Sequence, residues 1–136
     1  MTSDNPYTHE DPKRIMVVDD EPALSKITRV NLEKLGGYTV CEVNDPLKAI
    51  KTAKQFQPDL ILMDVVMPIL SGGELAEKIR SRPEFKGVPI IFLTSMVSGK
   101  EAAGHGLVKG GERFLSKPIV REVLLNTVAE ALEDKL

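Results

Sequence analysis

The sequence predicts an α/β domain in which a parallel sheet carries helices on both faces. Two observations support this prediction. Five short apolar runs recur along the 136 residues, and segments with helical spacing separate them. Because parallel strands must be joined by crossover segments, this alternation is typical of a parallel sheet. Apolar residues make up 42% of the chain and charged residues 28%, so the domain can bury a core of ordinary size.

The predicted strands are short, and most of their apolar residues run without alternation, as is typical of strands buried on both faces. We place them at residues 15–18, 38–43, 59–63, 88–93 and 114–115. Residues 1–13 are polar, and we expect them to form a flexible lead-in. A single domain is then expected to cover residues 14–136.

The first helix is predicted to begin at Pro22, because proline suits the first turn of a helix, where its missing N–H is not needed. Gly36 and Gly37 are expected to end this helix. Three large apolar residues share one of its faces: Leu24, Ile27 and Leu35. Their spacing is that of an amphipathic helix.

The later helices show similar local signals. Asp45 is expected to cap the second helix, with Pro46 in its first turn and Ile50, Ala53 and Phe56 on its core side. Ser71 and Glu74 have the spacing of a capping box, which predicts a third helix from about Gly72. The last helix has the clearest apolar pattern, at Val120, Val123, Leu124, Thr127, Val128 and Ala131.

The segment 98–109 is the weakest helix candidate. Gly99, Gly104 and Gly106 lie inside it. Each interior glycine costs about 1 kcal/mol relative to alanine in a helix. We therefore expect a short, frayed or mobile segment there.

Composition excludes several classes of function. The net charge is −2 and basic residues are not clustered, so nothing electrostatic favours nucleic acid. The apolar runs are far shorter than the ~18 residues of a membrane span, and the first residues do not form a signal peptide. Cys41 is the only cysteine, which allows no internal disulfide. We expect a cytoplasmic protein that binds neither nucleic acid nor a membrane.

Polar residues follow four of the predicted strands. Asp19 and Asp20 come after the first strand, Asp64 after the third, and Thr94 after the fourth. Lys117 follows the fifth strand closely. Because open α/β sheets bind ligands at the carboxyl ends of their strands, these five residues are candidates for one shared site.

The chemistry of this cluster points to a divalent cation. Two like charges about 4 Å apart repel by about 4 kcal/mol at an effective dielectric constant of about 20, and three carboxylates give three such pairs. Oxygen ligands from few protein positions suit Mg²⁺, which keeps several waters and often bridges carboxylates to phosphate.

Asp64 is a candidate nucleophile for a phosphoryl group, because carboxylates form aspartyl phosphates and this transfer needs mainly positioning and charge neutralisation. Thr94 is then the nearest donor for the phosphoryl oxygens. The alternative is structural, since an aspartate at a strand end is commonly a turn former or a helix cap. The spacing of these residues along the sequence allows both a phosphoryl-accepting site and a purely structural role.

Five motifs in order resemble the response-regulator receiver domain of bacterial two-component signalling. They are Val17-Val18-Asp19-Asp20-Glu21-Pro22, Leu62-Met63-Asp64-Val65-Val66-Met67-Pro68, Gly72, Phe92-Leu93-Thr94-Ser95 and Phe114-Leu115-Ser116-Lys117-Pro118. The similarity extends from Lys13 to Leu132, and its extent is that of the stand-alone chemotaxis regulator. It implies a flavodoxin-like, doubly wound (βα)5 fold with a five-stranded parallel sheet in the order 2-1-3-4-5.

The resemblance also implies roles for the acidic residues. Asp64 is expected to be the phospho-acceptor. Asp20, Asp64 and the backbone carbonyl of Val66 are expected to ligate Mg²⁺, with Asp19 acting mostly through water.

Thr94 and Lys117 are expected to hold the phosphoryl group, with a cis peptide between Lys117 and Pro118. Phe114 takes the place of the aromatic residue that rotates inward when the threonine moves. Since Phe114 lacks a hydroxyl, the resemblance implies a purely steric switch.

Val66 and Met96 occupy positions where many members of the family carry polar residues that influence water attack on the phosphoryl group. Two apolar side chains cannot orient a hydrolytic water. We therefore predict slow self-dephosphorylation.

The resemblance implies a sensor histidine kinase or a phosphotransfer protein as the phosphodonor. The chain ends directly after the last helix, so we expect no output domain and a signal passed on by contact with another protein. Leu125, Ala129 and Leu132 form a second apolar facet on that helix. They are either scattered surface residues or a patch for a homodimer or partner.

Two other classes of protein share features of this sequence. A phosphatase of the haloacid dehalogenase type also uses an aspartate nucleophile, but its second acid follows two residues later, and Asp19-Asp20-Glu21-Pro22 lacks that arrangement. The closer alternative is a binding module that keeps the receiver fold and works without phosphorylation.

Overall fold

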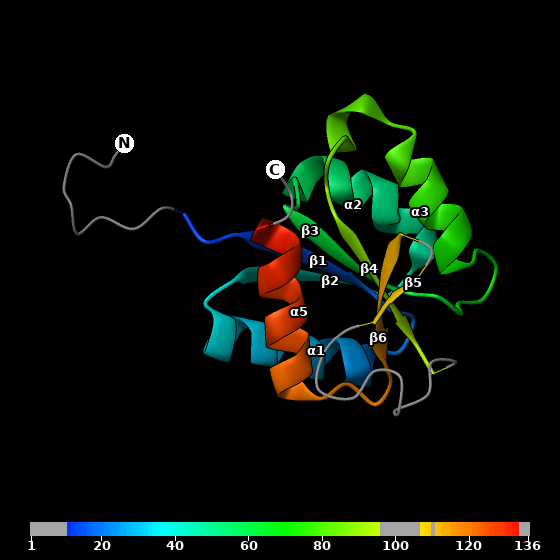
Figure 1. Ribbon diagram of the computed structural model, residues 1–136. Helices are drawn as coiled ribbons and strands as arrows, with labels where there is room; N and C mark the ends of the chain where they lie inside the picture. The colour runs from blue at the N-terminus through cyan, green and yellow to red at the C-terminus, as the bar shows by residue number, and fades with distance from the viewer. Residues whose placement is uncertain (1–10, 96–106, 110, 134–136) are drawn as a thin grey trace, which may run out of the picture.

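The computed structural model describes residues 11–95, 107–109 and 111–133 (Figure 1). Within these residues, six strands form one sheet in the order β2-β1-β3-β4-β6-β5. They are β1 (Arg14–Val18), β2 (Thr39–Val43), β3 (Leu60–Asp64), β4 (Ile90–Thr94), β5 (Leu107–Lys109) and β6 (Glu112–Ser116). The predicted lead-in at residues 1–13 falls mostly outside the described residues.

Helices cover both faces of the sheet. They are α1 (Pro22–Gly36), α2 (Ala49–Phe56), α3 (Gly72–Arg80) and α5 (Arg121–Glu133), with short 3₁₀ helices η1 (Pro46–Lys48) and η2 (Pro83–Phe85). In Figure 1, α1 and α5 lie on one face of the sheet, and α2 and α3 on the other. Each face buries its own apolar cluster, as continuous apolar strands require. None of the helices within the described residues is long and apolar enough to cross a membrane.

The predicted fold class is confirmed. β1, β2, β3, β4 and β6 are parallel, and their order along the sheet is the predicted 2-1-3-4-5. The register brings the ends of the strands level: Val18 pairs with Met63, Asp64 with Leu93, and Thr94 with Ser116. The residues that follow these strands therefore meet at one edge.

The sixth strand was not predicted. β5 pairs antiparallel with β6, from Leu107 opposite Phe114 to Lys109 opposite Glu112. The helix predicted over 98–109 falls mainly outside the described residues, but its last three residues are strand and not helix. Gly111, with φ 81°, supplies the left-handed backbone that the turn into β6 needs.

The apolar face predicted for α1 is not the face that α1 buries. Ile27 is 58% exposed and Leu35 54% exposed, while Ser25, Thr28 and Leu32 are buried. The buried hydroxyls have partners: Thr28 donates to the carbonyl of Leu24, and Ser25 to Glu42. Since these hydrogen bonds satisfy the polar groups, α1 can bury a partly polar face.

The predicted cap of α3 is confirmed, whereas the predicted cap of α2 belongs to the short helix that precedes it. Ser71 and Glu74 form the predicted capping box. Asp45 accepts a hydrogen bond from the Leu47 N–H, but the helix that it caps is η1, and α2 begins only at Ala49. In α2, Ala53 is buried, and the other two predicted core residues are half-buried against the same apolar cluster: Ile50 and Phe56.

The predicted stripe of α5 is only partly buried. Its central residues are in the core: Leu124, Thr127, Val128 and Ala131. Val123 is half-buried, while Val120 is exposed and precedes the helix. The second facet is also partly covered within the chain, because Leu125 and Leu132 pack against the core and only Ala129 is exposed.

Candidate functional site

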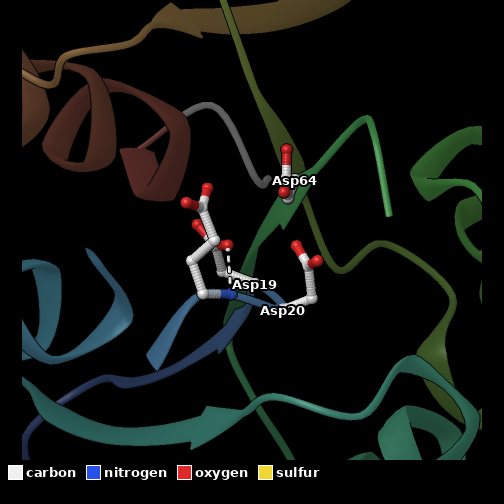
Figure 2. A group of neighbouring side chains, drawn as sticks. Asp19, Asp20 and Asp64 are labelled. Carbon is white, nitrogen blue, oxygen red and sulfur yellow. Dashed lines mark hydrogen bonds between the residues drawn. The ribbon is translucent and has the colours of Figure 1, made fainter. Parts of the chain in front are cut away.

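Two neighbouring strands present the candidate carboxylates. Asp64 is the last residue of β3, and Asp19 and Asp20 directly follow β1. Figure 2 shows the three side chains gathered where these strands end. The backbone holds both turns: the Asp19 N–H donates to the carbonyl of Val43 at 3.0 Å, and the Val65 N–H to that of Leu93 at 3.0 Å.

A fourth carboxylate joins the cluster. Ligand oxygens of Asp19, Asp20, Glu21 and Asp64 all lie within 4.8 Å of one another. Asp19 and Asp64 are buried, Asp20 is half-buried and Glu21 is exposed, so the cluster opens toward solvent on the Glu21 side. Glu21 was not predicted as a site residue, although its place directly after two candidate ligands was a usable signal.

Lys117 is the cation of this cluster. Its Nζ lies 3.2 Å from Asp19 Oδ2, 3.4 Å from Asp64 Oδ1 and 3.6 Å from Glu21 Oε1. Its backbone N–H donates to the carbonyl of Thr94 at 2.9 Å, and the peptide to Pro118 is cis, as expected. Lys117 therefore bridges the carboxylates of β1 and β3 from the end of β6.

The electrostatics leave the cluster short of positive charge. Burial raises the pKa of Asp64, the neighbouring Asp19 raises it further, and the value reaches about 6. Burial acts to lower the pKa of Lys117, but the charges of Asp19 and Asp64 outweigh it, and the pKa is raised. Four carboxylates facing one ammonium leave a formal excess of three negative charges when all are ionised.

The donor set fits a hard divalent cation. Every candidate ligand atom is a carboxylate oxygen, without histidine or cysteine among the described groups that cluster here. Mg²⁺ accepts such oxygens from a few positions and completes its shell with water, whereas Ca²⁺ prefers a fuller oxygen cage. A bound Mg²⁺ would also relieve the repulsion between the carboxylates.

The other predicted site residues lie around this cluster. Thr94 is buried at the end of β4. The Val66 N–H donates to Asp64 Oδ1 at 3.3 Å, and the residue is 65% exposed. Met96 lies outside the described residues.

Phe114 lies in β6 beside the fourth strand. Its ring centroid is 5.6 Å from that of Phe92, with the planes tilted by 32°. Both rings line an open hollow of about 210 Å³ with Val65 and Gly73. Val65, the residue directly after Asp64, therefore shares this hollow with the aromatic pair.

Fold and site together define a doubly wound α/β protein with an acidic pocket at the carboxyl ends of its strands. Residues 15–129 match the response regulator receiver domain, and the chain belongs to that family. Receiver domains are phosphorylation-activated signalling switches of two-component systems and bind Mg²⁺ at an acidic pocket.

Relatives of similar length include the polar-differentiation response regulator DivK of Brucella anthropi. It is 32% identical over 125 residues, which cover 90% of this chain and 98% of DivK. The crystallised chemotaxis protein CheY4 of Vibrio cholerae has a TM-score of 0.75 and 28% identity, over 88% of this chain and 98% of CheY4.

Other relatives are much longer than this chain. The DNA-binding transcriptional regulator RpaA of Synechocystis is 32% identical over 119 residues, which make up 88% of this chain but 48% of RpaA. The chain spans about half the length, or less, of the first curated relatives that it matches.

Proposed function

We propose that this chain is a signalling switch in which Asp64 accepts a phosphoryl group from a sensor histidine kinase or a phosphotransfer protein. The observation that carries the proposal is the contact of one lysine, Lys117, with carboxylates from two strands, 3.2 Å from Asp19 and 3.4 Å from Asp64. A buried carboxylate beside a fixed ammonium has the positioning and charge compensation that phosphoryl transfer requires.

Mg²⁺ is the proposed cofactor. Asp20 and Asp64 would hold it directly with the backbone carbonyl of Val66, and Asp19 would act mostly through water. When bound, the ion supplies positive charge to the phosphoryl oxygens and to the carboxylates. The spacing of the carboxylate oxygens supports this assignment, and Glu21 adds a further oxygen at the exposed side.

The covalent step uses this chain's own residues. A carboxylate oxygen of Asp64 attacks phosphorus, the bond between phosphorus and the donor breaks, and the donor leaves with that electron pair. Lys117 compensates the charge of the phosphoryl group, and the Thr94 hydroxyl donates to one of its oxygens. The domain thus catalyses only its own phosphorylation and dephosphorylation.

The signal would leave the site through Thr94 and Phe114. Movement of Thr94 toward the phosphoryl group vacates space at the end of β4, and Phe114 on the next strand turns toward it. The ring of Phe114 borders an open hollow of about 210 Å³, which supports such a movement. Because Phe114 has no hydroxyl, the change presented to a partner would be one of shape.

We further propose that residues 14–136 form one receiver domain that acts in the cytoplasm through contact with a downstream protein. Cys41 is consistent with a reducing compartment: it is half-buried in β2, and burial raises the pKa of its thiol to about 11. The α5 surface could instead form a homodimer. Of the second facet, Ala129 is the residue that is exposed for such a contact.

The proposal is tested by intact mass spectrometry after incubation with Mg²⁺ and acetyl phosphate. The wild type is expected to gain the mass of one phosphoryl group, and Asp64→Asn to gain none. Asp59→Asn is a matched control, because Asp59 accepts from the backbone N–H of Arg14 on the opposite edge of the sheet. This variant should be phosphorylated like the wild type.

Beryllofluoride with Mg²⁺ provides the second measurement, followed by NMR. Amide shifts at Asp64, Thr94 and Phe114 are expected to move together. If neither reagent changes the wild type, the receiver-fold binding module without phosphorylation is the better description.

A further inference from the structure

A side chain outside the acidic cluster holds the backbone of that cluster. Asn44 follows β2, and its Nδ2 donates to the carbonyl of Asp19 at 2.7 Å. That carbonyl belongs to the peptide that joins Asp19 to Asp20. The bond therefore acts on the one peptide group whose orientation sets the directions of both carboxylates relative to each other.

The second hydrogen of the same amide nitrogen is also used. Asn44 Nδ2 donates to Ser25 Oγ at 2.9 Å, and the Ser25 hydroxyl is itself 2.6 Å from Glu42 Oε1. Ser25 is fully buried, on the face where α1 meets β2. The serine oxygen accepts from Asn44, and its single proton goes to the Glu42 carboxylate at 2.6 Å rather than to the Pro22 carbonyl, which lies farther away at 3.2 Å.

Glu42 is anchored in turn by an arginine of α1. Arg29 Nε donates to Glu42 Oε2, and Arg29 Nη1 donates to Glu33 Oε1 at 2.9 Å. Burial acts to raise the pKa of Glu42, but the hydrogen bonds from Ser25 and Arg29 outweigh it, and the pKa is lowered. Glu42 therefore stays an acceptor.

These bonds fix the direction of the whole chain of donors and acceptors. With Glu42 as acceptor, Ser25 must donate to it, and the Asn44 amide must present its nitrogen to Ser25. The same nitrogen then faces the Asp19 carbonyl, which can only accept. The reverse orientation of the amide would set two oxygens against each other.

We propose that Asn44, oriented by Ser25 and Glu42, is a positioning residue for the cation site. It holds the Asp19–Asp20 peptide from one side, while the bond from the Asp19 N–H to the carbonyl of Val43 holds Asp19 from the other. This inference rests on the proposed Mg²⁺ site, because its effect is on how well the carboxylates are arranged for that ion.

Asn44 is suited to a test because it is exposed and follows the strand, so replacing it removes the two hydrogen bonds without opening the core. Asn126, an exposed residue of α5, provides the matched control Asn126→Ala. The measurement is the Mg²⁺ dissociation constant by titration calorimetry, with thermal unfolding recorded separately in the presence of a chelator.

Asn44→Ala is expected to weaken Mg²⁺ binding by about three- to tenfold, the effect of losing a hydrogen bond that orients a ligand. Asn126→Ala should bind as the wild type does. Asn44→Ser, whose hydroxyl has one proton and cannot serve both acceptors, should also bind more weakly than the wild type, and it replaces Asn44→Ala if that variant does not fold.

The outcomes separate this inference from the proposed function. A wild type that binds no Mg²⁺ removes the site itself. A wild type that binds, together with an Asn44→Ala or Asn44→Ser variant of equal affinity, overturns the positioning role, even if the unfolding temperature of the variant falls.

Discussion

A Cβ atom on Gly72 would lie 2.2 Å from the main-chain oxygen of Asp64 and 3.0 Å from its carbonyl carbon. The first residue of α3 and the last residue of β3 therefore meet through main-chain atoms, an approach that only glycine allows. The Gly72 N–H also donates to the carbonyl of Val65 at 2.9 Å. The start of α3 is thus fixed against the strand end that carries the proposed phospho-acceptor.

Gly72→Ala is expected to destabilise the protein by about 2–3 kcal/mol, because the added methyl group overlaps main-chain atoms that cannot rotate away. Gly73→Ala is the matched control, since a Cβ there would meet only Ser71 Oγ at 4.0 Å. That variant should gain up to about 1 kcal/mol from helix propensity. Urea unfolding followed by circular dichroism measures both, and equal stabilities would contradict the close approach.

Asp64→Asn is expected to stabilise the metal-free protein at neutral pH. Burial and Asp19 raise the pKa of Asp64 to about 6. A folded pKa above the unfolded value means that this group contributes stability below about pH 4, and that the contribution is lost as pH rises through 6. After allowance for solvent screening, the gain from removing the charge is about 1–2 kcal/mol.

The gain should shrink as the pH is lowered toward 4, where the wild-type carboxyl is protonated too. Thermal unfolding in a chelator, across that pH range, makes the measurement. Asp11→Asn, at an exposed position before β1, serves as the control for removing a surface charge. A pH-independent difference between Asp64→Asn and the wild type would argue against a raised pKa.

Mg²⁺ binding is expected to weaken steeply in acid. The ion needs an ionised Asp64, whose pKa is about 6, so the apparent affinity should fall by up to tenfold per pH unit below that value. Calorimetry in two buffers of different ionisation enthalpy detects the proton that is released. A Mg²⁺ affinity that stays constant from neutral pH down to about 5 would contradict the raised pKa of Asp64.

Ile69→Asn is expected to stabilise the protein by about 1 kcal/mol. Ile69 has φ 74°, a left-handed backbone that costs a β-branched residue about 1–2 kcal/mol. Its side chain is 86% exposed, so little packing is lost, and asparagine tolerates this conformation. Leu47→Asn, at another exposed site but with a helical backbone, should be neutral. Chemical denaturation of the two variants tests the difference.

Val66→Asn is expected to accelerate loss of the phosphoryl group from Asp64. Val66 is two residues beyond Asp64 and exposed, and an amide there can orient water that the valine methyl groups cannot. The decay of the phosphorylated protein, followed by intact mass, should be several times faster than in the wild type. A wild-type form that decays rapidly, with Val66→Asn no faster, would exclude this role.

The sequence was sufficient for the parallel framework because its signals are local. Continuous apolar runs identified the buried strands. The residues that follow each run can be read from the sequence without knowledge of any tertiary contact. Once the strands are parallel and level, Asp19, Asp20 and Asp64 must share an edge. Their roles in metal binding and phosphorylation stay predictions.

The predictions that were wrong or missing concern features that depend on contacts between segments distant in the sequence, or on the geometry of a turn. On α1, spacing alone cannot tell that the buried Ser25 hydroxyl would find Glu42 and Asn44, so the larger apolar residues were grouped on what is the exposed face. The strand β5 is equally hidden, because three residues give no periodicity and only the pairing with β6 defines it. Glu21 joins the carboxylates only through the turn geometry after β1.

The β5–β6 hairpin bears on edge-to-edge association, because β5 pairs with the side of β6 that faces away from β4. Without β5, the five residues of β6 would offer a row of unpaired amides and carbonyls to any extended peptide. β5 covers that border and leaves only three residues of its own at the outside. We expect a deletion that removes β5 to expose this side of β6 and so to promote edge-to-edge aggregation.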